Sequence, residues 1–409
     1  MEGIVQMPAS LEQVRFANRA QVLRAFLGGG VCSAGEVAER IGLSRQTVMK
    51  AIQFFLRTGL LASGGKGAST SLGGKRPELF ELTRERYFLC ITMWPDYLHI
   101  HLATIGGVTA ADLVRREPLP ADPKEALRRV GRQAAELVRD TGVRMEQVKA
   151  VSISTAGIMD YETGSLRYSS QSPDWGSGVP LRELLGQWFP DALILPENTG
   201  KMTARPFLLE RSLARKRVLV VFACWGLSGC LIDRGSILSG SNSLIGEIGH
   251  MTIDPTDPEI CGCGSRGCLE RLVSAERLRQ KAKEWTGEYL TSILNPDSLT
   301  VPAVFHASGE GDALARRLVA YLAECFATAL RNVSLVFDPD VVVFQGDFAV
   351  ADDHFRRTLM DHVRDFRYFP RGCPFELRFD LRELTGMDIR GSMIALTEQY
   401  FGRPELYMD

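Results

Sequence analysis

The sequence predicts an α/β protein with two unequal parts, a small helical N-terminal part and a large part in which strands and helices alternate. In the large part, which starts near residue 87, six strand-like runs alternate with helical patterns at 124–140, 274–285 and 312–336. The strand-like runs are 88–93, 98–103, 150–154, 193–195, 218–223 and 341–344. Such alternation is typical of an α/β architecture. The chain has 409 residues, enough for two or three domains.

The composition is that of a folded globular protein, with 45% hydrophobic and 24% charged residues. These values exclude a disordered, collagen-like or coiled-coil chain. The net charge of −1, taken alone, argues against a nucleic-acid-binding protein. The charge is unevenly divided, however: residues 1–86 carry 12 Lys/Arg against 7 Asp/Glu, and the remainder carries 36 against 42. A basic N-terminal part and an acidic remainder indicate two different tasks.

Three helical patterns follow one another in the first 58 residues. The first, over residues 12–27, ends at a run of three glycines. Ser33 and Glu36 have the spacing of a capping box, in which each side chain bonds a free amide at a helix start. That second helix ends at Gly42, and Ser44 is suited to cap a third helix running to Thr58.

Two short helices joined by a tight glycine turn predict a helix-turn-helix. In the third helix, Val48, Ile52, Phe55 and Leu56 form the predicted buried stripe, and polar and basic residues lie opposite. Residues 59–82 then predict a β-hairpin wing with a basic tip. Side chains that can reach phosphates and base edges are Ser44, Arg45, Gln46, Thr47, Lys50, Gln53, Lys75 and Arg76. The alternative is a small helical bundle with a solvated polar face and a flexible linker.

The sequence also contains a dense cluster of metal-binding residue types. The run Gly246–His250 reads Gly-Glu-Ile-Gly-His, and residues 261–270 read Cys-Gly-Cys-Gly-Ser-Arg-Gly-Cys-Leu-Glu. His250, Cys261, Cys263 and Cys268 make a complete set for a structural, tetrahedral zinc ion, and the glycines allow tight turns between them. Redox-active thiols and buried cysteines without a metal are the alternatives, while an iron–sulfur cluster would normally need a fourth cysteine.

These two runs together strongly resemble the signature of the ROK family (repressor, open reading frame, kinase), which contains sugar kinases and sugar-responsive repressors. The resemblance covers almost the whole chain, with one extra residue between His250 and Cys261 compared with the usual family spacing. It implies an N-terminal winged helix-turn-helix followed by a two-lobed, actin-like ATPase fold of the ribonuclease H-like class. The implied division is 1–86 and 87–409, with lobes at about 87–205 and 206–390 and a C-terminal helix that returns to the first lobe.

Three motifs of the family's kinases are altered in this chain. The Asp-x-Gly-Gly-Thr turn is replaced by residues 91–96, Ile-Thr-Met-Trp-Pro-Asp, in which Pro95 offers no amide donor. In the Glu-Asn-Asp-Ala-Asn motif the catalytic Asp becomes Thr199, whose hydroxyl cannot act as a base near neutral pH. The Gly-rich phosphate loop is replaced by residues 224–229, which contain Trp225, and a late Gly-Gly pair is altered to Gln345-Gly346-Asp347. The sequence therefore predicts that the protein is not an enzyme.

The sugar-binding positions implied by the resemblance are better preserved. Carried over one by one, they are Gln171, Asn198, Glu247, His250 and Glu270, with Gln171 standing where the family has Asn and Thr199 replacing an Asp. Each could instead have a structural role: Glu247 as a helix cap, His250 as a zinc ligand alone, and Glu270 as a solvated acid in a first helical turn.

The sequence thus predicts a DNA-binding transcriptional regulator, a repressor of carbohydrate-metabolism genes that responds to a sugar or phosphosugar. The alternatives are an active ROK sugar kinase with a DNA-binding appendage and a ligand-blind DNA binder that uses the ROK domain for oligomerisation. Expected partners are double-stranded operator DNA, the effector and a second or further copies of the chain in a homodimer or homotetramer. The N-terminus lacks a signal pattern, and the apolar run 218–232 is shorter than the ~20 residues of a membrane span, so a cytoplasmic location without membrane contact is expected.

Overall fold

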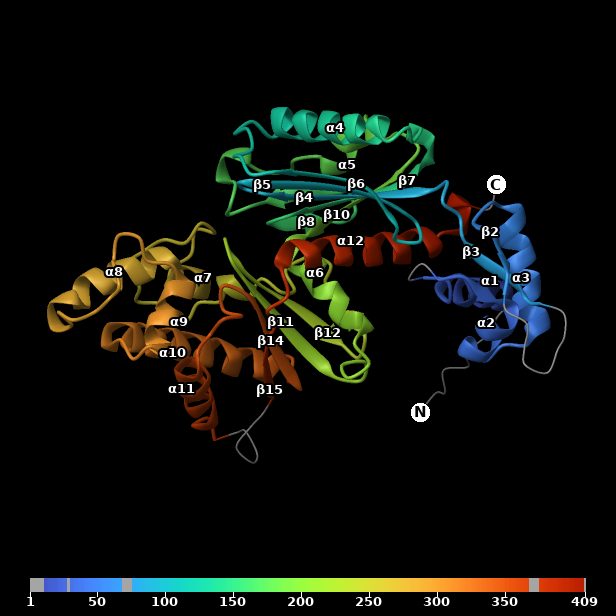
Figure 1. Ribbon diagram of the computed structural model, residues 1–409. Helices are drawn as coiled ribbons and strands as arrows, with labels where there is room; N and C mark the ends of the chain where they lie inside the picture. The colour runs from blue at the N-terminus through green and yellow to red at the C-terminus, as the bar shows by residue number, and fades with distance from the viewer. Residues whose placement is uncertain (1–10, 28–29, 68–75, 368–374, 408–409) are drawn as a thin grey trace, which may run out of the picture.

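The computed structural model describes residues 11–27, 30–67, 76–367 and 375–407, which form a small N-terminal unit and two lobes (Figure 1). The N-terminal unit lies at one end of the molecule, beyond the end of the long helix α12 (Leu384–Phe401). It contains three helices and a three-stranded antiparallel sheet of order β1-β3-β2. Its elements are α1 (Leu11–Arg24), β1 (Cys32–Ser33), α2 (Ala34–Ile41), α3 (Arg45–Arg57), β2 (Leu61–Lys66) and β3 (Glu78–Leu82).

The helix boundaries predicted for α2 and α3 are confirmed by their caps. The Ser33 amide donates to Glu36 Oε2 at 2.7 Å and the Glu36 amide to Ser33 Oγ at 3.3 Å, which completes the capping box. Gly42 ends α2 with a φ of 69°, a left-handed conformation that favours glycine. The Thr47 amide donates to Ser44 Oγ at the start of α3.

The predicted buried stripe of α3 is right except at one position. Val48, Ile52 and Phe55 are fully buried, but Leu56 is 36% exposed and the prediction of its burial is wrong. Ala51 is buried in its place, because a helix turns by 100° per residue and positions 48, 51, 52 and 55 share one side better than 56 does. The predicted contact Lys75 lies outside the described residues.

The first lobe is a five-stranded sheet of order β10-β7-β4-β5-β6, in which β10, β7 and β4 are parallel and β4, β5 and β6 antiparallel. Helices α4 and α5 pack on one face through the buried cluster around Leu89 and Val130. The elements are β4 (Tyr87–Trp94), β5 (Tyr97–Thr104), β6 (Thr109–Arg115), α4 (Pro123–Asp140), β7 (Val148–Thr155), β8 (Ile158–Asp160), β9 (Ser165–Tyr168), α5 (Leu181–Gly186), β10 (Leu193–Asn198) and α6 (Thr199–Ala204).

The second lobe has a five-stranded sheet of order β13-β12-β11-β14-β15, and helices α7 to α11 build the largest buried cluster against one face of it. Its elements are β11 (Arg217–Ala223), β12 (Leu227–Asp233), β13 (Ser236–Ile237), α7 (Leu269–Leu272), α8 (Ala275–Trp285), α9 (Val301–Gly309), α10 (Ala313–Val336), β14 (Val341–Gly346), α11 (Asp353–Arg364) and β15 (Glu376–Phe379). All nine strands and helices predicted for the large part are present in the two lobes.

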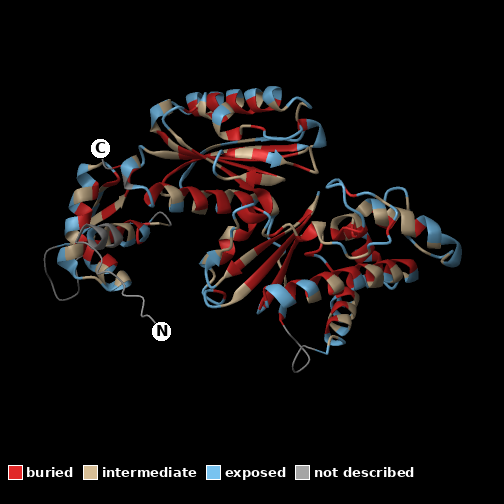
Figure 2. Cartoon of the chain, turned by 180° about the vertical axis from the view of Figure 1, so that it is seen from behind, coloured by how far each residue is buried: buried red, intermediate tan, exposed pale blue. Residues whose placement is uncertain are grey.

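Helices α6 and α12 lie between the two sheets. Ala204 of α6 and Met387 of α12 pack on the second-lobe sheet, while α12 also contacts β4 and β7 of the first lobe. Figure 2 shows the resulting run of buried residues along α12. Because α12 belongs to both interfaces, a change in the angle between the lobes must be accommodated at this helix.

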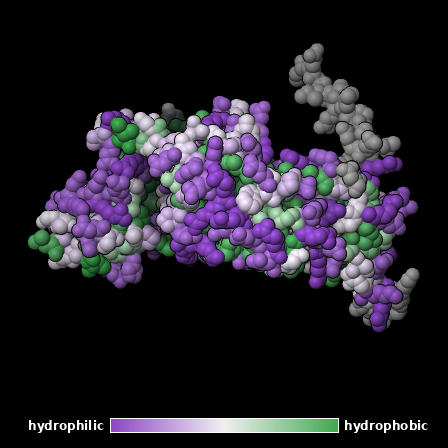
Figure 3. All heavy atoms as spheres, turned by 90° about the horizontal axis from the view of Figure 1, so that it is seen from above, coloured by the Kyte–Doolittle hydropathy of each residue, from purple (hydrophilic) through white to green (hydrophobic). Residues whose placement is uncertain are grey.

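One helix, α10, is long and apolar enough to cross a membrane by length and composition alone, and 56% of its apolar window is buried inside the protein. Its buried side packs against α9 and α11 and, through Phe326, against Phe344 of β14, as the core helix of a folded domain does. On the face of the molecule seen from above, hydrophilic residues predominate and hydrophobic ones occur in small separate spots (Figure 3). Such isolated surface hydrophobics are ordinary.

Candidate functional site

A cavity between the two lobes brings together all five predicted ligand residues. The empty space in the cavity and in its opening to solvent totals about 620 Å³. The first lobe contributes Gln171, Asn198 and Thr199, and the second contributes Glu247, His250 and Glu270. Their convergence from distant parts of the chain makes this cavity the candidate ligand site.

Asn198 and Glu270 are also used within the fold. Asn198 Oδ1 accepts from the Gly200 amide at 2.8 Å and caps α6, while its Nδ2 donates to the Gly157 carbonyl. Glu270 Oε2 accepts from the Leu227 amide at 2.7 Å. A ligand hydroxyl would therefore meet side chains that are already held in place, and only part of their hydrogen-bonding capacity remains for it.

Glu247 is the most available acid in the cavity. In the part of the chain that the structure describes, no side-chain hydrogen bond to its carboxylate is found, and the residue lies beside His250, Lys201 and Glu270. Burial raises the pKa of the Glu247 carboxyl, and Glu270 adds to the rise, whereas His250 and Lys201 oppose it. Glu247 is half-buried, and a partly desolvated acceptor of this kind favours a ligand that donates hydroxyl protons.

Two tryptophans, both within altered kinase motifs, form a contact across the cavity. The Trp94 and Trp225 rings, one from each lobe, lie with centroids 4.6 Å apart. Trp94 Nε1 also donates to Thr199 Oγ1 at 3.2 Å. Both tryptophans line the cavity, at the motif positions where the family resemblance implies the glycine-rich phosphate turns of the kinases. In the sequence, both tryptophans lie in altered glycine motifs, and this was the signal from which their contact could have been suspected.

Thr199 connects the cavity to a buried acid on α12. Its hydroxyl lies 3.1 Å from Ser154 Oγ, which donates to Asp388 Oδ2 at 2.5 Å. Thr92 Oγ1 donates to the other oxygen, Asp388 Oδ1, also at 2.5 Å. Asp388 is fully buried, and burial raises its pKa to about 7, although the Ser154 and Thr92 hydroxyls oppose the rise. Sequence reasoning missed this residue.

The pKa of Asp388 predicts a pH-dependent stability. Its folded pKa lies above the ordinary carboxyl value, so the folded state holds a proton that the unfolded state releases between about pH 4 and 7. Asp388 should therefore lower the free energy of unfolding as pH rises through that window, by up to roughly 4 kcal/mol. Urea unfolding of wild type and Asp388→Asn measures this: the difference should grow with pH in favour of the variant, and a difference independent of pH would refute the assignment.

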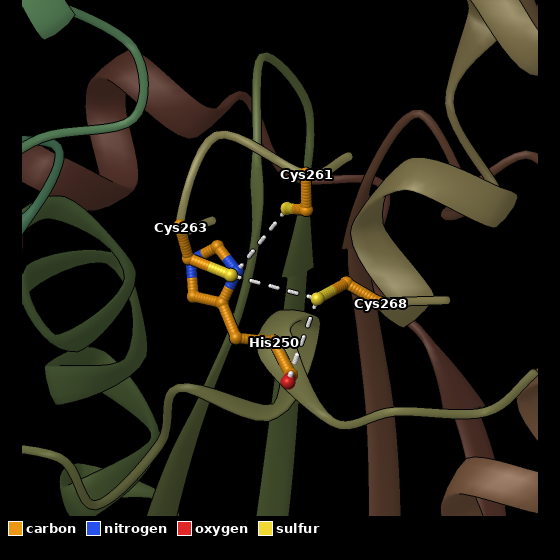
Figure 4. Close-up of side chains that lie close together, drawn as sticks. All are labelled: His250, Cys261, Cys263 and Cys268. Carbon is orange, nitrogen blue, oxygen red and sulfur yellow. Dashed lines mark hydrogen bonds between the residues drawn. The ribbon is translucent and has the colours of Figure 1, made fainter. Parts of the chain in front are cut away.

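The predicted metal ligands converge at the side of the cavity (Figure 4). The ligand atoms of His250, Cys261, Cys263 and Cys268 all lie within 4.8 Å of one another. His250 Nδ1 is 3.6 Å from Cys261 Sγ, and Cys263 Sγ is 3.6 Å from Cys268 Sγ. Three sulfurs and one imidazole with such separations fit a tetrahedral zinc ion with closed coordination. Cys261 and Cys268 are buried, His250 is half-buried and Cys263 is exposed.

The loop that carries the cysteines contacts the opposite lobe. The turns rest on Gly264 and Gly267, whose φ angles are 87° and 66°. Gly262 also lies in a turn, without a positive φ, and a Cβ there would lie 3.2 Å from Ser170 of the first lobe. Tyr168 of that lobe donates its hydroxyl to the Gly262 carbonyl at 2.8 Å. The loop that carries the cysteines is therefore held against two first-lobe residues, Tyr168 and Ser170, that line the cavity.

At the N-terminal unit, the polar face of α3 is free of the protein core. Arg45, Gln46, Lys50 and Gln53 are exposed, and so is Arg76 next to β3. The Ser44 and Thr47 hydroxyls lie 2.9 Å apart at the helix start. Of the described members of the predicted DNA-binding set, Thr47 is half-buried and the others are exposed.

The C-terminal end of α12 is joined to the end of α3. Arg86 donates to the Tyr400 hydroxyl at 2.7 Å and to the carbonyl of Thr58, the C-cap of α3, at 2.6 Å. Tyr400, Phe401 and Tyr407 belong to one buried cluster with Phe55 of α3. The orientation of α3 is therefore tied to the helix that carries Asp388.

Comparison with known proteins gives a family match and relatives of two kinds. The sequence model described as "ROK family" matches residues 107–370. A xylose repressor from Caldicellulosiruptor bescii is 25% identical over 85% of this chain and 87% of its own. The transcriptional dual regulator NagC of Escherichia coli is 25% identical, covering 84% and 83%. A glucokinase from Thermotoga maritima is 26% identical but covers 62% of this chain and 80% of its own.

Solved structures share the fold. A ROK family transcriptional regulator, a homologue of the E. coli MLC protein, matches with a TM-score of 0.75 at 18% identity, over 95% of this chain and 98% of that one. A ROK hexokinase from Thermus thermophilus matches with a TM-score of 0.57 at 24% identity, over 76% and 97%. The predicted α/β fold, similar to that of actin-like sugar kinases, is confirmed for the large part of the chain.

Proposed function

Because the chain belongs to the ROK family, we propose that it is a cytoplasmic, DNA-binding transcriptional regulator, a repressor controlled by a sugar or phosphosugar in the cavity between its lobes. The observation that carries this proposal is the contact between Trp94 and Trp225 in the cavity, at motif positions that correspond to phosphate turns in the kinases, while the same cavity is lined by the sugar-binding residue types. The repressor relatives, which cover more of this chain than the glucokinases, support the same conclusion.

The N-terminal unit is proposed to be a winged helix-turn-helix, occupying residues 1–86, with the rest of the chain as the sensor. In support, two capped helices joined by a tight turn precede a pair of antiparallel strands, and α3 has an exposed basic and polar face. A recognition helix of this kind enters a major groove, and a symmetric pair of them reads two half-sites of operator DNA. This requires a homodimer or homotetramer.

The proposed cofactor is one structural zinc ion, bound by His250, Cys261, Cys263 and Cys268. His250 also lines the cavity, and the loop that carries the cysteines accepts a hydrogen bond from Tyr168 of the first lobe. The ion would therefore hold the ligand-binding side chains at fixed positions. It has no proposed catalytic role, since all four coordination positions would be filled by the protein.

The proposed transmission of the signal runs through α12. A bound ligand could change the contacts that Trp94 makes with Thr199 and Trp225. Because Thr199 is hydrogen-bonded to Ser154, and Ser154 to Asp388, such a change would also disturb the position of Asp388. The C-terminal end of α12 packs against α3 and is connected to it through the hydrogen bonds of Arg86. A small rotation of α12 would therefore change the spacing of the two α3 helices in a dimer. The effector would thereby weaken or strengthen DNA binding.

The main alternative, an active sugar kinase, is tested by ATP hydrolysis coupled to a panel of sugars. We expect no sugar-dependent turnover, because the base position is Thr199 and because Trp94 and Trp225 stand at the motif positions of the phosphate turns. Thr199→Asp alone should remain inactive, since it restores the base but leaves Trp94, Pro95 and Trp225 in place. Sugar-dependent turnover by the wild-type protein would overturn the proposal.

A further inference from the structure

Three further residues of metal-binding types meet on the first-lobe sheet, far from the cysteine cluster in sequence and on other elements. His99 and His101 belong to β5, and Asp112 belongs to the edge strand β6. Alternate residues of a strand point to one face, and residues paired across two strands share a face. Since His101 pairs directly with Asp112 in the sheet register, all three side chains lie on the same side.

The two imidazoles converge on a single carboxylate oxygen. His99 Nε2 lies 2.7 Å and His101 Nδ1 lies 2.8 Å from Asp112 Oδ1, and the three ligand atoms are within 4.8 Å of one another. A tetrahedral ion with bonds of about 2.0–2.1 Å needs ligand atoms about 3.4 Å apart. Asp112 Oδ1 would have to move outward to admit an ion, and its side chain is 44% exposed.

The imidazoles are held in position before any ion binds. Their side chains are 15% and 12% exposed, and the two rings meet edge to face with centroids 6.2 Å apart. Tyr97 packs in the same manner against His99. The opposite face of β5 is buried under α4 through Leu98, Ile100 and Leu102. The packing of β5 therefore fixes the orientation of the two histidines. Asp112 is more exposed, so solvent can approach the three side chains from its side.

We propose that His99, His101 and Asp112 form a second metal site, which binds a divalent transition-metal ion such as Zn²⁺ with a coordination position left for water or an outside ligand. Two imidazoles and one carboxylate are the donors that zinc and its neighbours in the first transition row prefer, whereas Mg²⁺ and Ca²⁺ prefer oxygen ligands alone. The site does not depend on the proposed regulatory function. An ion there would join the edge strand β6 to β5 on the sheet face opposite α4.

Metal stoichiometry tests the proposal. Full-length protein without an affinity tag is stripped with a chelator and titrated with Zn²⁺, and bound zinc is counted by calorimetry and elemental analysis. The wild type should bind two ions per chain and the double variant His99→Gln/His101→Gln one. The control His306→Gln removes an exposed histidine that also lies near an acid, Glu310, and should still bind two.

A second variant and a spectroscopic probe keep the result interpretable. Asp112→Asn changes a half-exposed side chain, so it tests the site even if the double variant does not fold, and it should also reduce binding to one ion. With Co²⁺, the cysteine cluster gives thiolate-to-metal charge-transfer absorption, and the second ion should add none. One zinc ion in the wild type, or two in folded His99→Gln/His101→Gln, would show that Asp112 only accepts hydrogen bonds from the imidazoles.

Discussion

Replacing Cys268 by alanine should release the proposed zinc ion and lower the free energy of unfolding by about 3–5 kcal/mol. Cys268 is fully buried at the start of α7, and its sulfur lies within 4.8 Å of the ligand atoms of His250, Cys261 and Cys263. Losing one of four ligands removes most of the affinity, and the binding free energy of a structural ion is part of the folding free energy. Elemental analysis and urea unfolding of the full chain measure the two effects.

The matched control is Cys230→Ala, because Cys230 is equally buried but lies in β12, outside the cluster. That variant should retain zinc and lose only about 1 kcal/mol, the cost of removing a small buried group. If Cys268→Ala keeps its metal, or if the two variants are equally stable, the cluster is not a structural zinc site.

Alanine at Arg45 or Lys50 should weaken binding to operator DNA by about 1–3 kcal/mol each, roughly 5- to 150-fold. Both side chains project from the exposed face of α3, Arg45 in its first turn and Lys50 further along, while the buried face holds the unit together. If the replaced residue contacts a base edge, the variant should distinguish less well than the wild type between DNA sequences. If the replaced residue binds a phosphate, the affinity of the variant should depend less steeply on salt concentration. Fluorescence anisotropy on a bound fragment at several salt concentrations distinguishes these two contacts.

Arg139→Ala is the control for charge, because Arg139 is exposed on α4, on the far face of the first lobe. It should leave DNA affinity unchanged, and all three variants should keep the wild-type melting temperature. Unchanged affinity in both α3 variants would mean that another surface contacts DNA.

The parts of the fold that follow from local chemistry were predictable from the sequence. The caps at Ser33 and Ser44 and the regular strands of the two lobes depend on residues close in the chain. Helix α12 was harder to recognise, because the side it buries between two sheets includes Asp388, Gly391 and Ser392, which carry no hydrophobic periodicity. Edge strand β6 is largely exposed and likewise lacks the pattern of a buried strand.

The candidate site was predictable residue by residue but not in its connections. Gln171, Glu247 and Glu270 could be selected from their motifs, and the fold brings them to one cavity. That Trp94 meets Trp225, or that Thr199 reaches Asp388 through Ser154, depends on contacts between segments that are far apart in the sequence, by 45 residues for Thr199 and Ser154 and by 234 for Ser154 and Asp388. Such long-range contacts follow from the packing of the lobes, which residue spacing alone does not determine.

The most direct test of the regulatory account is selection of DNA fragments by the purified full-length protein, followed by titration of the bound fragment with sugars and phosphosugars. The account predicts that a two-fold symmetric site is enriched, that one compound changes its affinity, and that Glu247→Ala removes this response while leaving DNA binding intact. Enrichment of no sequence above non-specific binding, or a specific site whose affinity no compound changes, would contradict it.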